Sequence, residues 1–190
     1  MPFNAYQGIR WAWMAIGLIW LALAFTNKRT ARRQDAGTLI LHILVLGLAF
    51  DLIFSDFFRR GVLGWRFVAE LDAIGFGGFA ITTAGIAFAI WARLYIGRNW
   101  SGTVTVKQDH ELVREGPYSL VRHPIYSGLS LALLGTALVV GEVRCLLAFA
   151  LVVFEFKRKS LLEERFMIEQ FGAQYVQYRR EVKSLVPFVW

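Results

Sequence analysis

Long apolar stretches separated by short basic clusters set the pattern of the chain. Residues 11–26, 38–54 and 71–95 are almost wholly apolar, and each has roughly the length of about 20 residues that a helix needs to cross the hydrocarbon core of a membrane. Residues 126–156 form a fourth apolar block, which is too long for one crossing. Because Gly141-Glu142-Val143-Arg144 in its middle predicts a tight turn, we expect five spans, of which the last two form a helical hairpin.

The third apolar stretch is rich in glycine. Gly75, Gly77, Gly78 and Gly85 lie along it, and small residues let neighbouring helices in a membrane approach closely. We therefore expect this span to pack tightly against another.

The basic residues divide unevenly between the two sides that five spans would define. Residues 27–37, 93–122 and 157–190 together hold 16 Lys and Arg residues, whereas the N-terminus, the 55–70 loop and the 141–144 turn hold 5. Cytoplasmic loops carry the excess of Lys and Arg. The sequence therefore predicts that the N-terminus lies outside and the C-terminus lies in the cytoplasm.

Composition supports a membrane protein and excludes other classes. Hydrophobic residues make up 56% of the chain and charged residues 18%, against about 25% charged in soluble domains. We predict an all-α, multi-pass bundle forming one membrane domain over residues 1–190, with three spans in residues 1–96 and a catalytic, cofactor-binding half in residues 97–190. The first apolar stretch has no small-residue cleavage site, so it is read as an anchor.

The charge and the single cysteine narrow the expected partners. The net charge is +7, but the basic residues lie at the ends of apolar stretches, where they meet lipid headgroups. We therefore expect no nucleic-acid partner. The lone Cys145 excludes an internal disulfide and a multi-cysteine metal site, and no metal is expected.

The segment from Gly116 to Tyr126 is the first candidate for chemistry. It places two prolines, two tyrosines, an arginine and a histidine directly before an apolar run. Pro124 can serve as the first residue of the fourth span, so the free N–H groups of that helix start would favour an anionic group nearby. One interpretation is an interfacial loop that anchors to headgroups. The density of polar groups beside hydrocarbon favours a site instead.

The tail after residue 156 is the second candidate. Lys159 and Glu163 lie four residues apart on one face of a predicted amphipathic helix that continues the last span. Gly172 interrupts this helix, and residues 173–182 resume it. An ordinary surface ion pair remains the alternative for Lys159 and Glu163.

Three further polar residues fall within the apolar stretches. His42 and Asp51 lie in the second and Asp72 lies near the start of the third. We place them on or toward the non-cytoplasmic half, away from both candidate segments, and expect them to form hydrogen bonds between helices.

Residues from about 98 to 187 resemble the isoprenylcysteine carboxyl methyltransferase family and its bacterial and phospholipid-methylating relatives. The resemblance rests on Arg-His-Pro-x-Tyr ending at Tyr126, the helical hairpin, the paired glutamates Glu163 and Glu164, Phe-Gly-x-x-Tyr-x-x-Tyr ending at Tyr178, and Pro187. It implies S-adenosylmethionine as cofactor, held between the loop before the fourth span and the tail.

The resemblance also implies which residues form the site. It places cofactor contacts at His110, Glu111, Leu112, Val113, Tyr118, Arg122, His123, Pro124, Ile125, Tyr126 and Glu163. Lys159 and Glu163 would be the catalytic residues, with Lys159 near the acceptor. The family has an arginine where this chain has Lys159, and a lysine keeps the charge but loses the planar two-pronged grip on a carboxylate.

Several functions remain open at this point. The first is methyl transfer to a lipophilic acceptor, through a carboxylate such as that of isoprenylcysteine or through a lipid amine or thiol. The second is an NADPH-dependent membrane reductase of the sterol-reductase type, against which the short chain argues. The third is a non-catalytic membrane protein with the same architecture. The oligomeric state is left open.

Overall fold

A computed structural model describes residues 4–24, 30–33, 36–97, 105–107 and 112–188. Its five long helices are α1 (Ala5–Ala24), α2 (Ala36–Phe54), α3 (Asp72–Ile96), α5 (Pro124–Val140) and α6 (Val143–Phe171). The short elements are β1 (Thr30–Arg33), the 3₁₀ helices η1 (Asp56–Phe58) and η2 (Gly61–Gly64), β2 (Thr105–Lys107), α4 (Pro117–Leu120) and α7 (Ala173–Glu181).

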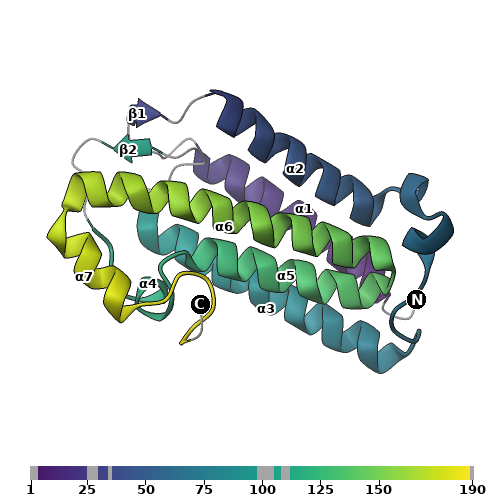
Figure 1. Cartoon of the computed structure of the whole chain (residues 1–190). Helices are drawn as coiled ribbons and strands as arrows, with labels where there is room; N and C mark the ends of the chain where they lie inside the picture. The colour runs from purple at the N-terminus through teal and green to yellow at the C-terminus, as the bar shows by residue number, and fades with distance from the viewer. Residues whose placement is uncertain (1–3, 25–29, 34–35, 98–104, 108–111, 189–190) are drawn as a thin grey trace.

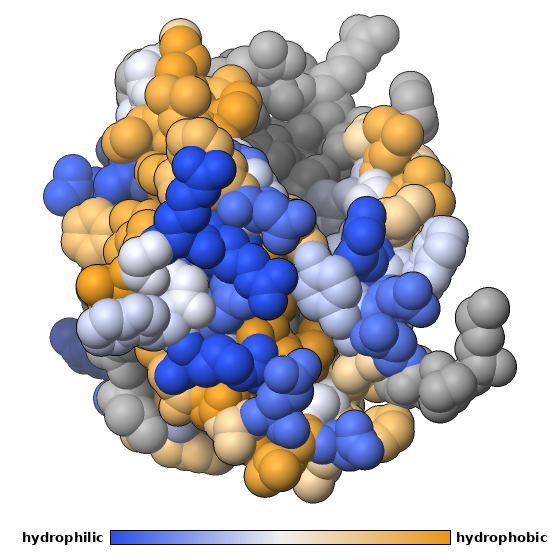
Figure 2. All heavy atoms as spheres, turned by 90° about the vertical axis from the view of Figure 1, so that its right-hand side faces the viewer, coloured by the Kyte–Doolittle hydropathy of each residue, from blue (hydrophilic) through white to orange (hydrophobic). Residues whose placement is uncertain are grey.

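The five long helices run back and forth along a common direction (Figure 1). At one end of the bundle, here called the α4–α7 end, lie α4, α7 and both strands; η1, η2 and the turn between α5 and α6 lie at the other (Figure 1). Figure 2 faces that other end and shows hydrophilic residues across its middle with hydrophobic residues around them. This end is therefore polar at its centre and apolar around it.

Among the described residues, three helices are long and apolar enough to cross a membrane, namely α1, α2 and α3, and α5 is a shorter apolar helix. Their outward faces carry large apolar side chains: Leu18 is 66% exposed, Leu21 61% and Leu44 64%. Exposed apolar faces of this kind mark a surface that contacts lipid or another protein, and their place on helices of spanning length is typical of a lipid-facing surface. These are the features of an integral membrane protein.

The predicted hairpin turn and tail helix are both present. Gly141 ends α5 in the left-handed conformation with φ of 72°, and α6 begins two residues later at Val143 and continues without interruption to Phe171. Gly172, with φ of 54°, separates α6 from α7. The expected amphipathic continuation of the last span is thus one 29-residue helix.

Glycine brings α3 and α5 into backbone contact. A Cβ added at Gly85 would lie 2.5 Å from the carbonyl oxygen of Gly128, and one at Gly135 would lie 2.5 Å from that of Gly78. The expectation of close packing is therefore confirmed for Gly78 and Gly85. It is wrong for Gly77, which has no atom within 4 Å of such a Cβ.

The main core lies between α2, α5 and α6. It includes Leu52, Leu133, Cys145 and Val152, each at most 2% exposed. Arg144 fastens the start of α6 to the end of α2, because its guanidinium donates to the carbonyl oxygens of Leu52 at 2.7 Å and Ser55 at 2.6 Å.

The all-α expectation is correct for the bundle but incomplete. β1 and β2 form an antiparallel two-stranded sheet with an irregularity between Thr30 and Arg32. Strand pairing joins two loops that are far apart in the sequence, and neither loop shows strong alternation of its own.

Substitution of glycine tests the close contact between α3 and α5. We expect Gly85→Ala to lower the thermal unfolding temperature in detergent, because its methyl group overpacks a backbone contact, at a cost of about 1–3 kcal/mol. Gly77→Ala is the matched control and should leave stability equal or slightly higher, since alanine is the better helix former. Equal melting temperatures for the two variants would contradict the contact.

Candidate active site

The polar segments singled out in the sequence meet at the α4–α7 end. There α4 and the start of α5 lie beside the C-terminal half of α6, α7 and the segment that follows α7 (Figure 1). As expected, α5 begins at Pro124, with His123 as its N-cap residue.

Backbone hydrogen bonds dock the C-terminal segment on the start of α5. The N–H groups of Arg122 and His123 donate to the carbonyl oxygens of Lys183 at 2.8 Å and Ser184 at 3.1 Å. The hydroxyl of Ser127 donates to the carbonyl oxygen of Leu185 at 2.5 Å. The tail is therefore fixed against the same residues that the sequence analysis placed in the site.

Glu164 is the centre of a buried ion cluster. Arg122 donates to its Oε1 from Nε at 2.9 Å and from Nη2 at 2.6 Å, and Arg179 Nε lies 3.1 Å from its Oε2. His123 Nε2 lies 3.2 Å from Oε1. Burial alone would raise the pKa of Glu164, but the hydrogen bonds and charges of His123 and Arg122 hold that pKa at about 2.

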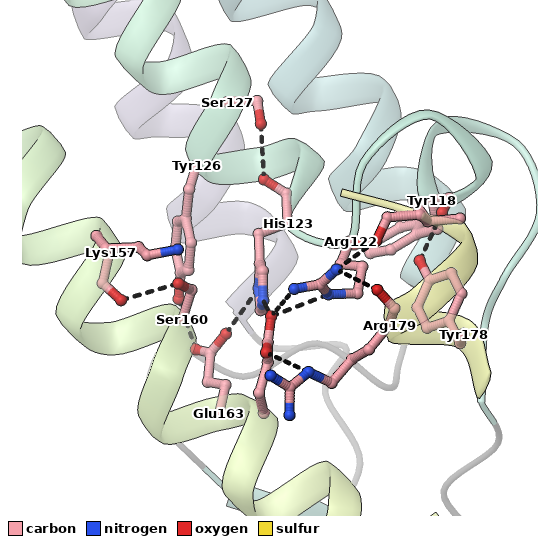
Figure 3. Close-up of polar contacts among 12 residues, drawn as sticks. Tyr118, Arg122, His123, Tyr126, Ser127, Lys157, Ser160, Glu163, Tyr178 and Arg179 are labelled. Atoms are coloured by element: carbon pink, nitrogen blue, oxygen red, sulfur yellow. Dashed lines mark hydrogen bonds and ion pairs between the residues drawn. The ribbon is translucent and has the colours of Figure 1, made fainter. Parts of the chain in front are cut away.

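Glu163 shares the same histidine but has a different environment. His123 Nδ1 lies 3.4 Å from its Oε2, and the hydroxyl of Tyr126 donates to its Oε1 at 2.5 Å (Figure 3). The side chain of Glu163 is 23% exposed, against 3% for Glu164. Glu163 is therefore the carboxylate that a ligand can reach.

His123 bridges the two carboxylates through both ring nitrogens. A carboxylate only accepts hydrogen bonds, so hydrogen bonds to both carboxylates at once require a hydrogen on both nitrogens, as in an imidazolium. Burial alone would lower the pKa of His123, but Glu163 and Glu164 raise that pKa above its ordinary value.

Aromatic rings continue the site toward the bundle. Tyr126 stacks on His123 with ring centres 5.7 Å apart and on Phe156 with centres 4.7 Å apart. The ammonium of Lys159 lies 5.8 Å from the centre of the Tyr126 ring. Lys159, Tyr126 and Glu163 thus border one region.

Tyr118 holds α4 in place between α3 and α7. Its hydroxyl lies 3.4 Å from the carbonyl oxygen of Ala92, and its own carbonyl oxygen accepts a 2.5 Å hydrogen bond from Tyr178. Burial raises the pKa of the Tyr118 phenol.

One expectation about lone polar residues is wrong. His42 forms the expected hydrogen bond between helices, with Nδ1 2.9 Å from Glu155 Oε1. It does not lie away from the candidate segments, however, because its Nε2 is 3.3 Å from Lys159 Nζ. α2 begins at Ala36 at the α4–α7 end, so a residue one to two turns into α2 is still beside the site (Figure 1).

The predicted site residues have different surroundings in the structure. His123, Tyr126, Lys159 and Glu163 meet around one region, and Arg122 is directed to Glu164 and to the carbonyl oxygens of Arg179 and Val182. Val113 and Ile125 belong to an apolar cluster, Pro124 is fully buried, and Leu112 is half-buried. His110 and Glu111 lie outside the described residues.

Sequence reasoning did not assign a role to three charged residues of this end, Glu155, Glu164 and Arg179. Glu155 had a signal, since it is an acid inside the apolar run 149–156 and stands four residues before Lys159. The role of Arg179 depends on the fold, because α7 must turn back at Gly172 before its guanidinium reaches Glu164.

The donor set fits an organic, polar cofactor. Glu163 offers an accessible carboxylate, the stacked rings of Tyr126 and His123 border it, and the buried hydroxyl of Ser184 has no hydrogen-bond partner among the described residues. Within the same described ranges, no group of three or more His, Cys, Asp or Glu side chains could hold a metal ion.

The sequence of the chain matches a known protein family over the region that forms the site. The family model described as phospholipid methyltransferase matches residues 74–174. The chain is 38% identical over 96 residues to protein-S-isoprenylcysteine O-methyltransferase B of Arabidopsis thaliana, covering 49% of each sequence. It is 37% identical over 101 residues to the Schizosaccharomyces pombe protein-S-isoprenylcysteine O-methyltransferase, covering 52% of this chain and 43% of that protein.

Longer matches exist as well. A probable protein-S-isoprenylcysteine O-methyltransferase of Oryza sativa subsp. indica is 29% identical over 172 residues, covering 89% of this chain and 87% of the relative. The solved structure of the eukaryotic intramembrane Ras methyltransferase ICMT (isoprenylcysteine carboxyl methyltransferase) matches with a TM-score of 0.55 at 22% identity, over 82% of this chain and 54% of that one.

These matches support the resemblance noted in the sequence, and the solved structure shows the same fold. The chain spans about half the length of the Arabidopsis and S. pombe relatives that it matches. The matched region contains both the Gly116–Tyr126 segment and Glu163. The chain therefore belongs to the phospholipid methyltransferase family and is related to the protein-S-isoprenylcysteine O-methyltransferases.

Proposed function

We propose that the chain is an integral membrane methyltransferase that uses S-adenosylmethionine and acts on a lipophilic acceptor. The observation that carries this proposal is Glu163: a partly exposed carboxylate, held by His123 and Tyr126 inside the region that the family model matches. The curated relatives support methyl transfer over an NADPH-dependent reductase, since all those described above are named as O-methyltransferases.

The residues of the α4–α7 end account for binding and orientation. Glu163 would hold the ammonium or the ribose hydroxyls of the cofactor, and Tyr126, whose hydroxyl is bonded to Glu163, would form part of the wall beside it. When bound, S-adenosylmethionine supplies a methyl group on a sulfonium. Transfer of such a group needs alignment in a dry site and no metal.

The other residues predicted to contact the cofactor would have separate roles. Tyr118, His123, Pro124 and Ile125 would form or support one wall. Leu112 and Val113 would be further cofactor contacts, as would His110 and Glu111. For Arg122, the proposed role is indirect: it holds Glu164 and the tail, and so keeps the wall that carries His123 in place.

The acceptor would reach the site from the lipid. α1, α2 and α3 present apolar faces, so an amphiphile in the bilayer can approach Lys159 between helices with its apolar part in the hydrocarbon. The isoprenylcysteine named in the relatives is one such acceptor. We further propose five crossings, with the N-terminus outside and the α4–α7 end in the cytoplasm, where the cofactor is available.

Cofactor binding is tested with S-adenosylhomocysteine by calorimetry in detergent. We expect Glu163→Gln to weaken the affinity at least about tenfold, because a hydrogen bond to a charged group contributes roughly 1.5–3 kcal/mol. The control is Glu115→Gln, an exposed acid on the loop before α4. A wild-type affinity for S-adenosylhomocysteine in Glu163→Gln would contradict the proposed role of Glu163 in cofactor binding.

The charge on His123 predicts a pH dependence of stability. Its pKa is raised above the ordinary value of 6.5, so the stability from its two carboxylate contacts is fully present below about pH 6.5 and is lost as the pH rises through the raised value. Thermal unfolding of the wild type and His123→Gln should therefore differ most near pH 6. A constant difference between pH 6 and pH 9 would contradict the imidazolium.

The proposed orientation is tested by labelling in intact cells. Cys145 is the only cysteine and is buried, so a membrane-impermeant maleimide should leave the wild type unlabelled. We expect Arg60→Cys to react from outside and Glu115→Cys to react only after the cells are permeabilised. The reverse pattern would show the opposite orientation.

A further inference from the structure

His42 and Glu155 form a buried polar pair beside the proposed site. His42 on α2 is 9% exposed and Glu155 on α6 is 2% exposed, and His42 Nδ1 lies 2.9 Å from Glu155 Oε1. Polar groups within a span are costly and are retained where they have a role. None of the cofactor contacts proposed above involves this pair.

Arg158 binds Glu155 and thereby determines which nitrogen of His42 carries a hydrogen. Arg158 donates to both carboxylate oxygens, from Nε to Oε2 at 2.8 Å and from Nη2 to Oε1 at 2.7 Å. A carboxylate bound in this way stays ionised and only accepts. The hydrogen between Glu155 and His42 therefore belongs to Nδ1 of the imidazole.

The other ring nitrogen faces a lysine. Nε2 of His42 lies 3.3 Å from Nζ of Lys159, which is 3% exposed. Only one hydrogen fits on the line between two nitrogens at this distance. Either an ammonium donates to a neutral imidazole, or an imidazolium donates to a neutral amine.

We propose that Lys159 and His42 share this one proton, so that Lys159 can act as the base for the acceptor while Glu155 steadies the ring that receives the proton. This inference rests on the proposed methyl transfer. For each methyl group gained, a thiol or amine acceptor loses one proton. Nζ of Lys159 accepts that proton, while Nε2 of His42 holds the proton that Lys159 gave up until it is released.

The charges around the pair allow both arrangements. From α6, Glu163 favours the ammonium, Glu155 favours the imidazolium, and Arg158 offsets Glu155. From α5, Tyr126 presents its ring to Nζ at 5.8 Å. A proton that moves between Lys159 and His42 thus stays close to a carboxylate at either position.

The lysine itself points to the class of acceptor. An arginine cannot give up its proton in a protein, whereas a buried lysine can serve as a base. A carboxylate acceptor releases no proton and needs only a fixed cation. The pair with His42 therefore favours a lipophilic acceptor with a thiol or an amine, and makes His42 a positioning residue for Lys159.

The shared proton can be observed without any reaction. The chain has three histidines, so protein labelled with ¹⁵N-histidine in detergent gives few signals, and His42→Gln identifies those of His42. We expect Nδ1 to be protonated and Nε2 unprotonated at neutral pH in the wild type. In Lys159→Met, Nε2 should take up a proton at a pH higher by about one unit or more, because a neighbouring cation is lost. An unchanged titration would overturn the shared proton.

A matched variant separates proton transfer from simple support. In His42→Gln the amide oxygen can still accept a hydrogen bond from Lys159 but cannot take up a proton. With a lipid thiol or amine as acceptor, we expect the rate to fall about tenfold or more and its rise with pH to change, with affinity for S-adenosylhomocysteine within about twofold of the wild type. A wild-type rate and pH profile in His42→Gln would contradict the relay.

The acceptor class is decided by the product. Membranes incubated with methyl-labelled S-adenosylmethionine and a lipid thiol, a lipid amine or a prenylated cysteine should yield a thioether or a methylated amine. Labelled methyl ester from the prenylated cysteine alone would overturn the acceptor class. A wild type that binds no S-adenosylhomocysteine would refute the proposed function, and the histidine signals would still decide whether the proton is shared.

Discussion

The buried carboxylate of Glu164 is the point on which the α4–α7 end depends. Its three cationic partners, Arg122, His123 and Arg179, come from the residues before α5 and from α7. Removal of one partner from a buried ion pair lowers the free energy of unfolding by about 3–5 kcal/mol, because the remaining charge is buried without a partner or water. The loop, the helix start and the tail are therefore held as one unit, although Arg122 and Arg179 are 57 residues apart in the sequence.

Two adjacent glutamates on α6 show how the same side chain takes different roles. Neighbouring residues on a helix point about 100° apart, so Glu164 is directed to the loop and α7 while Glu163 is directed to Tyr126. His123 contacts both. It links the carboxylate that holds the fold together with the one that remains accessible, which makes the geometry of the accessible carboxylate depend on the docked tail.

The sequence predicted those features that depend on local patterns. The lengths of the apolar stretches predicted helices at nearly the positions of α1, α2 and α3. The polar turn at residues 141–144 predicted the hairpin, and Pro124 predicted the start of α5. Features that depend on pairing at a distance were not predicted: the β1–β2 sheet, the partners of Glu164 and the contact of His42 with Lys159. The last could have been found, because residues 27–37 were expected on the same side as the tail, and His42 lies only five residues beyond them.

The continuous course of α6 has a mechanical consequence. From Val152 in the core to Glu163 at the site, 11 residues of unbroken helix span about 16 Å, at 1.5 Å per residue. A helix of this length moves as a rigid rod. In the proposed five-span arrangement the first half of α6 crosses the bilayer, so a lipid that displaces this half also displaces Glu163, and binding of a lipid between the helices changes the position of the site carboxylate.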